Sequence, residues 1–276
     1  MQAFRNFKTQ TWPPKPTFTE ANVPPGSQTG RVFMVTGGNT GIGFELCKIL
    51  FNSGATIYMA SRSKDKATAA IKEIVNSAPK NALGTGQLKF LQLDLADLKS
   101  VVAAAETFAA QEAKLDVLWD NAAAAAASSP GQAHQSAPPN GVDFNALDKG
   151  LKDRLANYGA SKAGTWFLAR EYGRHHGADG ILSVTLNPGN LHAGSFKGTP
   201  APAYFIMSAF ILHEPVFGAY TELYAGLSPD LKMEHNGTYV IPWGRRRLDS
   251  EITRQDIVKA ITSKAEGGLG CAMKLW

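Results

Sequence analysis

The chain turns sharply at Val35-Thr36-Gly37-Gly38-Asn39-Thr40-Gly41-Ile42-Gly43, between a β-branched apolar run that begins at residue 31 and a helical run over 44–52. The N-terminus of a helix offers free N–H groups and the positive end of the helix dipole to an anion. Glycines let the backbone approach a pyrophosphate closely. Glycine clusters are common in plain tight turns, but this one lies between a strand and a helix, which favours a dinucleotide-binding turn.

Strand and helix patterns alternate on the C-terminal side of this turn. Such alternation predicts an α/β fold, a Rossmann-type doubly wound parallel sheet in a single domain. We expect strands over 31–36, 55–60, 88–93, 115–119, 180–186 and 237–242, and helices over 44–52, 64–77, 98–113 and 153–175, with further apolar helices before the last strand.

Composition narrows the class of protein. With 44% hydrophobic and 18% charged residues among 276, the chain as a whole is not intrinsically disordered. The net charge is +5, but the basic residues form no long blocks, so we expect no nucleic-acid partner. Two cysteines supply neither a disulfide framework nor a four-ligand zinc site, and no metal is predicted.

Residues 1–30 read as an N-terminal extension, and 31–276 as the main domain. Proline pairs at 13–14 and 24–25 interrupt regular structure, while four aromatic residues suggest that the extension packs on the body. These are Phe4, Phe7, Trp12 and Phe18. We find no secretory signal and no apolar run of the roughly 18 residues that would span a bilayer, so a cytoplasmic location is expected.

The glycine-rich turn resembles the TGxxxGIG signature of short-chain dehydrogenases/reductases. Four further segments are similar to that family in the right order, and the resemblance runs from about residue 29 to the end of the chain. They are Leu93-Asp94-Leu95, 115–123, Tyr158-Gly159-Ala160-Ser161-Lys162 and Asn187-Pro188-Gly189-Asn190. The extension and Val240-Ile241-Pro242-Trp243-Gly244 also resemble a retinol-dehydrogenase-like branch found in fungi.

The choice of cofactor can be argued from charge. An acidic residue after the second strand would bind the ribose 2′-OH of NAD and repel a 2′-phosphate. Here the stretch 60–64 holds no acid, and Arg62 can bind a phosphate bidentately, so we expect NADP(H). The alternative is that Arg62 only begins a solvated helix face. The resemblance implies cofactor contacts from Gly37, Asn39, Thr40, Gly41, Ile42, Gly43, Arg62, Asp94, Leu95, Asn121, Tyr158, Lys162, Pro188, Gly189, Asn190 and Leu191.

Tyr158 and Lys162 are four residues apart and therefore share one helix face. A free tyrosine has a pKa of about 10 and is a poor acid–base group at neutral pH. A neighbouring ammonium group and a positive nicotinamide favour the phenolate, so Tyr158 can exchange a proton with a substrate oxygen. In the family the lysine also binds the nicotinamide ribose, and the cofactor carries the hydride. The pair predicts interconversion of a carbonyl and an alcohol.

The region 121–157 is atypically short. The family places a helix and a strand there, and that strand ends in the serine that binds the substrate carbonyl. Six alanines, Ala122–Ala127, stand in this place, and Ser129 is the candidate serine, with Ser128 and Ser136 as alternatives. Three explanations are open: the alanines conceal other, missing residues, the chain carries a deletion, or the protein is rebuilt with altered chemistry. The alternative function is a cofactor-binding pseudoenzyme or a non-redox enzyme.

Residues 195–220 occupy the place of the family's substrate lid. The runs 203–207 and 209–212 are apolar, which suggests a small lipophilic substrate. Two other interpretations are open: a helix packed on the body or on a second subunit of a homo-oligomer, and peripheral contact with a membrane.

Overall fold

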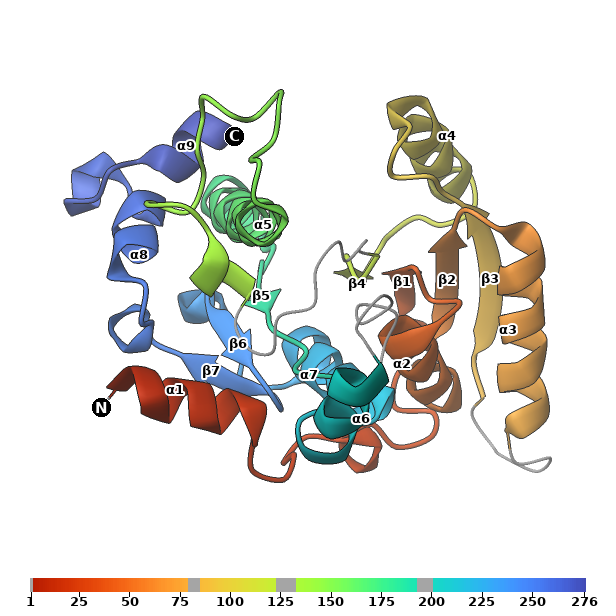
Figure 1. Cartoon of the computed structure of the whole chain (residues 1–276). Coiled ribbons are helices and arrows are strands. Elements are labelled where there is room, and N and C mark those ends of the chain that lie inside the picture. Colours follow the sequence, from red (N-terminus) through yellow and green to blue (C-terminus); the bar gives the residue numbers. More distant parts are fainter. Residues whose placement is uncertain (1, 79–84, 123–132, 193–200) are drawn as a thin grey trace. The chain divides into compact units, whose positions relative to one another are not determined.

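The computed structural model describes residues 2–78, 85–122, 133–192 and 201–276 (Figure 1). Their contacts group the chain into two compact units. We call the first the four-stranded unit, which comprises Phe18–Ala123 and Gly218–Gly226. The second is the three-stranded unit, which comprises Met1–Thr17, Ala124–Phe217 and Leu227–Trp276.

The four-stranded unit holds a fully parallel sheet in the order β3-β2-β1-β4. Each strand is followed by a helix or a turn that returns the chain to the start of the next, as the alternating pattern predicts. The predicted α/β fold with a parallel sheet is confirmed. The elements are β1 (Val32–Thr36), α2 (Gly41–Asn52), β2 (Thr56–Ser61), α3 (Lys64–Ser77), β3 (Gln87–Gln92), α4 (Leu98–Ala109) and β4 (Val117–Trp119).

Apolar side chains cover both faces of this sheet, because successive residues of a strand point to opposite sides. On one face Tyr58 meets Phe108 of α4 edge to face, with ring centres 4.9 Å apart. On the other, Phe33 meets Trp119 in the same way at 5.3 Å. The Trp119 indole N–H donates to the carbonyl of Glu222, in helix α7 (Pro215–Leu227), at 2.8 Å. This hydrogen bond ties the end of β4 to α7.

The three-stranded unit holds a mixed sheet in the order β5-β6-β7. Strands β5 and β6 are parallel, and β6 and β7 are antiparallel. Its core forms where Trp166 and Phe167 of α5 pack with Tyr239, Ile241 and residues of α8. The elements are α1 (Gln2–Thr11), α5 (Arg154–His176), β5 (Thr185–Leu186), α6 (Ala201–Phe210), β6 (Tyr239–Ile241), β7 (Arg245–Arg247), α8 (Gln255–Ile261) and α9 (Cys271–Leu275).

The strand expected over 237–242 is reduced to β6 (Tyr239–Ile241), and the two strands on either side of the region 121–157 are also shorter than predicted. The strand expected over 180–186 is reduced to β5 (Thr185–Leu186), and the one expected over 115–119 to β4 (Val117–Trp119). Each has a single neighbour among the described strands, so one row of its backbone N–H and C=O groups has no strand to pair with there. The described residues between β4 and β5 hold no strand, and residues 123–132 lie outside the described ranges.

The N-terminal segment differs from the prediction of irregular structure, since residues 2–11 form the helix α1. Its polar residues Asn6, Gln10 and Thr11 are buried, whereas Phe4 and Trp12 are 73% and 50% exposed. Hydrogen bonds, rather than the aromatic rings, therefore attach this helix, which runs beside β7 in Figure 1. No helix within the described ranges is long and apolar enough to cross a membrane.

Candidate active site

The carboxyl ends of the four parallel strands meet at one edge of their sheet, which is where ligands bind in folds of this kind. The glycine turn 37–43 follows β1, and Arg62 follows β2. Asp94 comes after β3, and Asn121 after β4. The structure therefore brings four of the predicted cofactor-binding segments to a single sheet edge.

Glycine is required at two positions of the turn. Gly37 has a φ of +67°, which favours glycine, and a Cβ on Gly43 would lie 2.5 Å from Nδ2 of Asn121. Thr40 precedes the first turn of α2, and its side chain makes no capping hydrogen bond within the described chain. The first N–H groups of α2 are therefore left for another acceptor, as an anion site at a helix N-terminus requires.

Asn121 joins the ends of two strands. Its Nδ2 donates to the carbonyl of Thr36 at 2.9 Å, and the Ala122 N–H donates to the Thr36 hydroxyl at 2.9 Å. That hydroxyl in turn donates to the carbonyl of Trp119. The side chain of Asn121 thus shapes the glycine turn, and its predicted contact with the cofactor ribose stays a prediction.

Arg62 lies directly after β2 with its side chain exposed. Its carbonyl accepts a hydrogen bond from the Gln92 amide at 3.0 Å, which fixes the backbone. The guanidinium forms no ion pair with any residue in the described ranges, and Lys64 and Lys66 beside it are also exposed. The end of β2 therefore presents cationic groups that can bind a phosphate.

The turn after β3 is stabilised by Asp94. Its Oδ1 accepts from the Ala96 N–H at 3.0 Å, and its own N–H donates to the Ser100 hydroxyl at 2.9 Å. The side chain of Leu95 is left about half exposed at this edge. An exposed apolar side chain there suits the predicted contact with the cofactor.

In the three-stranded unit, Tyr158 and Lys162 lie on one face of α5, with the Lys162 Nζ 5.7 Å from the centre of the Tyr158 ring. Asp153 caps this helix, since its Oδ1 accepts from the Leu155 N–H at 2.8 Å. Both side chains are half-buried. Burial raises the pKa of Tyr158 and lowers the pKa of Lys162, because each charged form loses solvation.

Of the three candidate serines, Ser128 and Ser129 lie outside the described residues. Ser136 ends a short 3-10 helix, and its hydroxyl donates to the Leu155 carbonyl on α5 at 3.1 Å. A Cβ on Gly159 would lie 2.6 Å from that hydroxyl oxygen, so glycine is needed for this approach. Ser136 therefore packs against α5 beside the residue that follows Tyr158.

The loop after β5, residues 187–191, is also held in place. The Asn187 Oδ1 accepts from the Gly189 N–H at 3.1 Å, and the Asn190 carbonyl accepts from the His213 N–H at 2.8 Å. Gly189 has a φ of +95°, and a Cβ there would lie 2.6 Å from the Trp243 ring. Asn190 and Leu191 are buried. Tyr158, Lys162 and this loop all belong to the three-stranded unit.

Sequence reasoning missed three residues that hold these segments: Thr36, Trp243 and Gln10. Thr36 lies in the glycine-rich turn motif 35–43, and Trp243 lies in the segment 240–244. Their positions in the sequence therefore pointed to the candidate site but did not reveal which contacts they make. The Gln10 Oε1 accepts from the Asn187 Nδ2 at 3.0 Å. Nothing in the sequence of the N-terminal segment signalled this contact.

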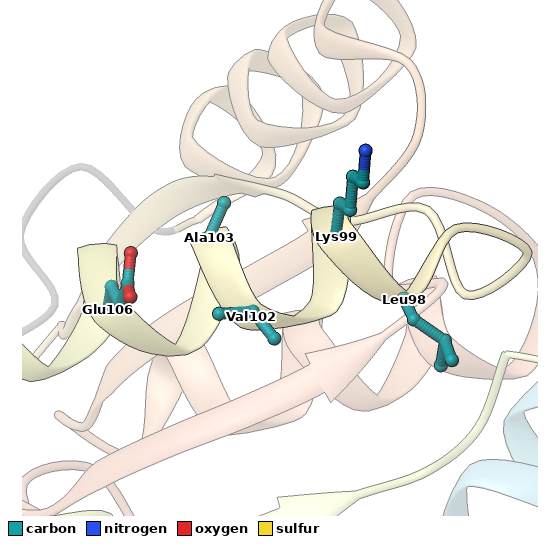
Figure 2. Close-up of a pocket in the computed structure, with 5 residues that line it drawn as sticks. All are labelled: Leu98, Lys99, Val102, Ala103 and Glu106. Carbon is teal, nitrogen blue, oxygen red and sulfur yellow. The ribbon is translucent and has the colours of Figure 1, made fainter.

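A shallow cavity lies on α4 and is shown in Figure 2. It is open helix surface, because Leu98 and Val102 are themselves largely exposed. None of the predicted site residues lines it. Its lining residues are Leu98, Lys99, Val102, Ala103 and Glu106.

Comparison with known proteins gives matches along the whole chain. A family model described as short chain dehydrogenase matches residues 31–142. A short-chain dehydrogenase/reductase of Pestalotiopsis fici is 37% identical, over 97% of this chain and 94% of its own length. One of Phomopsis amygdali is 34% identical, over 99% and 95%. A 3-oxoacyl-[acyl-carrier protein] reductase from Brucella melitensis, 14% identical, has a similar fold with a TM-score of 0.60 and covers 82% of this chain and 95% of its own.

The relatives are longer within the matched range. The Phomopsis alignment runs over 327 positions, whereas this chain has 276 residues, so at least 51 positions (327 less 276) hold no residue of this chain.

Proposed function

We propose a function for this chain, which belongs to the short-chain dehydrogenase/reductase family. It is an NADP(H)-dependent oxidoreductase that interconverts a carbonyl and an alcohol on a small lipophilic molecule. Family members are oxidoreductases that use a nicotinamide cofactor. The observation that carries the proposal is the arrangement on α5, where the Lys162 ammonium lies 5.7 Å from the centre of the Tyr158 ring.

The residues present fit a dinucleotide. Within the described chain the Thr40 side chain does not cap the N-terminus of α2, Gly43 carries no side chain there, and Arg62 presents an exposed guanidinium. When bound, the reduced cofactor would supply the hydride, and the oxidised nicotinamide ring carries a positive charge. Arg62 would bind the 2′-phosphate bidentately, which is the reason for proposing NADP(H) over NAD(H).

In the reducing direction, the Tyr158 hydroxyl donates its proton to the substrate oxygen while the carbonyl carbon accepts the hydride. Burial keeps Tyr158 protonated before this step, as its raised pKa indicates. The Lys162 ammonium then stabilises the phenolate that remains. Ser129 is the proposed donor to the substrate carbonyl, with Ser128 and Ser136 as alternatives.

The proposed substrate class rests on the exposed apolar side chains of α6. Phe205 and Phe210 are 74% and 70% exposed, and Ile206 is also exposed. Such a surface suits a lipophilic ketone, aldehyde or quinone. It would equally suit a second copy of the chain or peripheral contact with a membrane.

A panel of lipophilic ketones and quinones, assayed by the loss of NADPH absorbance, tests the function. We expect oxidation of NADPH with at least one member, and much slower oxidation of NADH. Tight NADPH binding without oxidation across the panel would contradict the oxidoreductase proposal.

One observation favours a second function, that of a cofactor-binding protein without redox turnover. No strand lies among the described residues between β4 and β5, where the serine-bearing strand is expected. Such a protein would bind NADPH through the four-stranded unit, and would leave every carbonyl of the panel unreduced.

A further inference from the structure

We propose that Gln10, on the N-terminal helix α1, is a positioning residue for the cofactor loop 187–191. The inference rests on the proposed function and on the cofactor contacts predicted for Pro188, Gly189, Asn190 and Leu191 of that loop. All the residues that carry it belong to the three-stranded unit.

Gln10 fixes the orientation of the Asn187 amide. The Asn187 Nδ2 donates to the Gln10 Oε1 at 3.0 Å, while the Asn187 Oδ1 accepts from the Gly189 N–H at 3.1 Å. Rotation of the Asn187 amide by half a turn would place its Oδ1 against the Gln10 Oε1, two acceptors, and its Nδ2 against the Gly189 N–H, two donors. Gln10 therefore holds Asn187 in the orientation that closes the turn at Gly189.

A second contact from the same helix end reaches the loop indirectly. A ring nitrogen of His213, Nε2, lies 3.2 Å from the Thr11 carbonyl. The His213 backbone pairs with the loop on both sides, since its N–H donates to Asn190 and its carbonyl accepts from the His192 N–H, both at 2.8 Å. Two successive residues of α1 thus act on the same loop.

Stability alone does not explain a glutamine at this position. Gln10 is only 2% exposed, and its Nε2 has no hydrogen-bond partner among the described residues. Burying a donor without a partner is unfavourable, so an apolar residue of the same length would suit the interior better. The Oε1 that binds Asn187 is the group that an apolar residue would lack.

The attachment of α1 does not depend on this contact. Arg245 donates to the carbonyl and the hydroxyl of Thr9, at 2.6 and 2.7 Å. Asn6 accepts from Arg247 at 2.8 Å and donates to the Glu251 carbonyl at 2.8 Å. Asn6 is buried one helical turn before Gln10 and touches no loop residue through a hydrogen bond, which makes it a matched control.

The test compares Gln10→Met with Asn6→Leu in the full-length protein. Each replaces one buried amide by an apolar side chain of similar size. NADPH Kd is measured from tryptophan fluorescence, KM and kcat from turnover, and Tm from thermal unfolding. We expect Gln10→Met to raise the Kd and KM for NADPH about tenfold, the effect of one lost hydrogen bond. Asn6→Leu should change Tm and leave both constants as in the wild type.

Two further variants test the contact between Gln10 and Asn187 itself. Gln10→Glu retains an oxygen acceptor at the same length, and its Kd should lie closer to the wild-type value than that of Gln10→Met. Gln10→Met combined with Asn187→Ala should bind NADPH no more weakly than Asn187→Ala alone, because both remove the same contact.

The outcomes separate the two proposals. Equal Kd values for Gln10→Met and Asn6→Leu would overturn the role of Gln10 and leave the proposed function intact. A wild-type protein that binds no NADPH would overturn the proposed function, and this inference with it.

Discussion

The Lys162 ammonium lies 5.7 Å from the centre of the Tyr158 ring, one helical turn along α5. Both groups are half-buried, and burial disfavours the charged form of each. A phenolate on Tyr158 therefore depends on the positive charge of Lys162 more than it would in water, because the interaction is screened less. This relationship makes the pH dependence of turnover a direct readout of the pair.

Lys162→Met removes that charge and keeps the length of the side chain. We expect kcat to fall about 10²- to 10⁴-fold, the usual contribution of an acid–base group. In the oxidation direction the phenolate is the base, so the rate rises with pH as Tyr158 loses its proton. Without Lys162 the pKa of Tyr158 rises further, and this alkaline limb should move to higher pH. If the alkaline limb of the pH–rate profile lay at the same pH in Lys162→Met as in the wild type, the proposed stabilisation of the phenolate by Lys162 would be contradicted.

Arg62→Ala tests the choice of cofactor. A charge-assisted hydrogen bond contributes about 1.5–3 kcal/mol, so KM for NADPH should rise about 10- to 100-fold while KM for NADH stays the same. Lys72→Ala, an exposed cation on the following helix α3, is the control for a general loss of positive charge. Equal effects of the two substitutions on NADPH would show that Arg62 makes no specific contact.

Gly189→Ala tests the packing of the loop 187–191. Gly180 has a similar positive φ of +82° and open space where a Cβ would be, so Gly180→Ala should cost only about 1–2 kcal/mol of backbone strain. At Gly189 the added methyl group meets the Trp243 ring at 2.6 Å, which should add about 1–3 kcal/mol. Urea unfolding of the two variants gives the comparison, and equal losses would argue against the tight contact.

Because of the buried carboxyl group of Glu222, we expect the free energy of unfolding to depend on pH. Its side chain is buried, and burial raises its pKa to about 8 from the ordinary 4.5. Between these values the unfolded chain has released the proton and the folded chain keeps it, so stability falls as pH rises. The slope is about 1.4 kcal/mol per pH unit for one proton. Glu222→Gln should remove this slope in urea unfolding measured across that range, and a wild type with no such slope would contradict the raised pKa.

The neighbouring thiol belongs to the same buried site. Cys47 is fully buried, and burial together with the charge of Glu222 raises its pKa well above the usual range. It stays protonated across the titration of Glu222 and adds no slope of its own.

The parallel sheet could be predicted because its apolar strands and glycine turn follow rules of local periodicity. The helix over 64–77 has the bounds expected from its spacing, as Ala67, Ala70 and Ile74 point inward. The helix α1 could not be predicted, because it buries Asn6 and Gln10 and exposes Phe4, the reverse of ordinary amphipathic patterning. Strand β7 consists of three arginines, and the role of Arg245 and Arg247 as anchors for α1 depends on distant partners.

The candidate site was predictable where spacing alone fixes the geometry. Tyr158 and Lys162 meet because four residues make about one helical turn, and the segments after β1 to β4 share an edge because the strands are parallel. The contact of Gln10 with Asn187 joins residues 177 positions apart, and no local rule specifies such a pair. The lengths of β4 and β5 likewise did not follow from local pattern, since the expected strands over 115–119 and 180–186 extend beyond both of them.

Tyr158→Phe tests the central claim most directly, because it removes one hydroxyl and keeps the ring beside Lys162. NADPH Kd and the single-turnover rate of NADPH oxidation are measured on wild type and variant with the best carbonyl of the panel. We predict an unchanged Kd and an oxidation rate lowered about 10²- to 10⁴-fold. An unchanged oxidation rate would contradict the claim that Tyr158 supplies the proton.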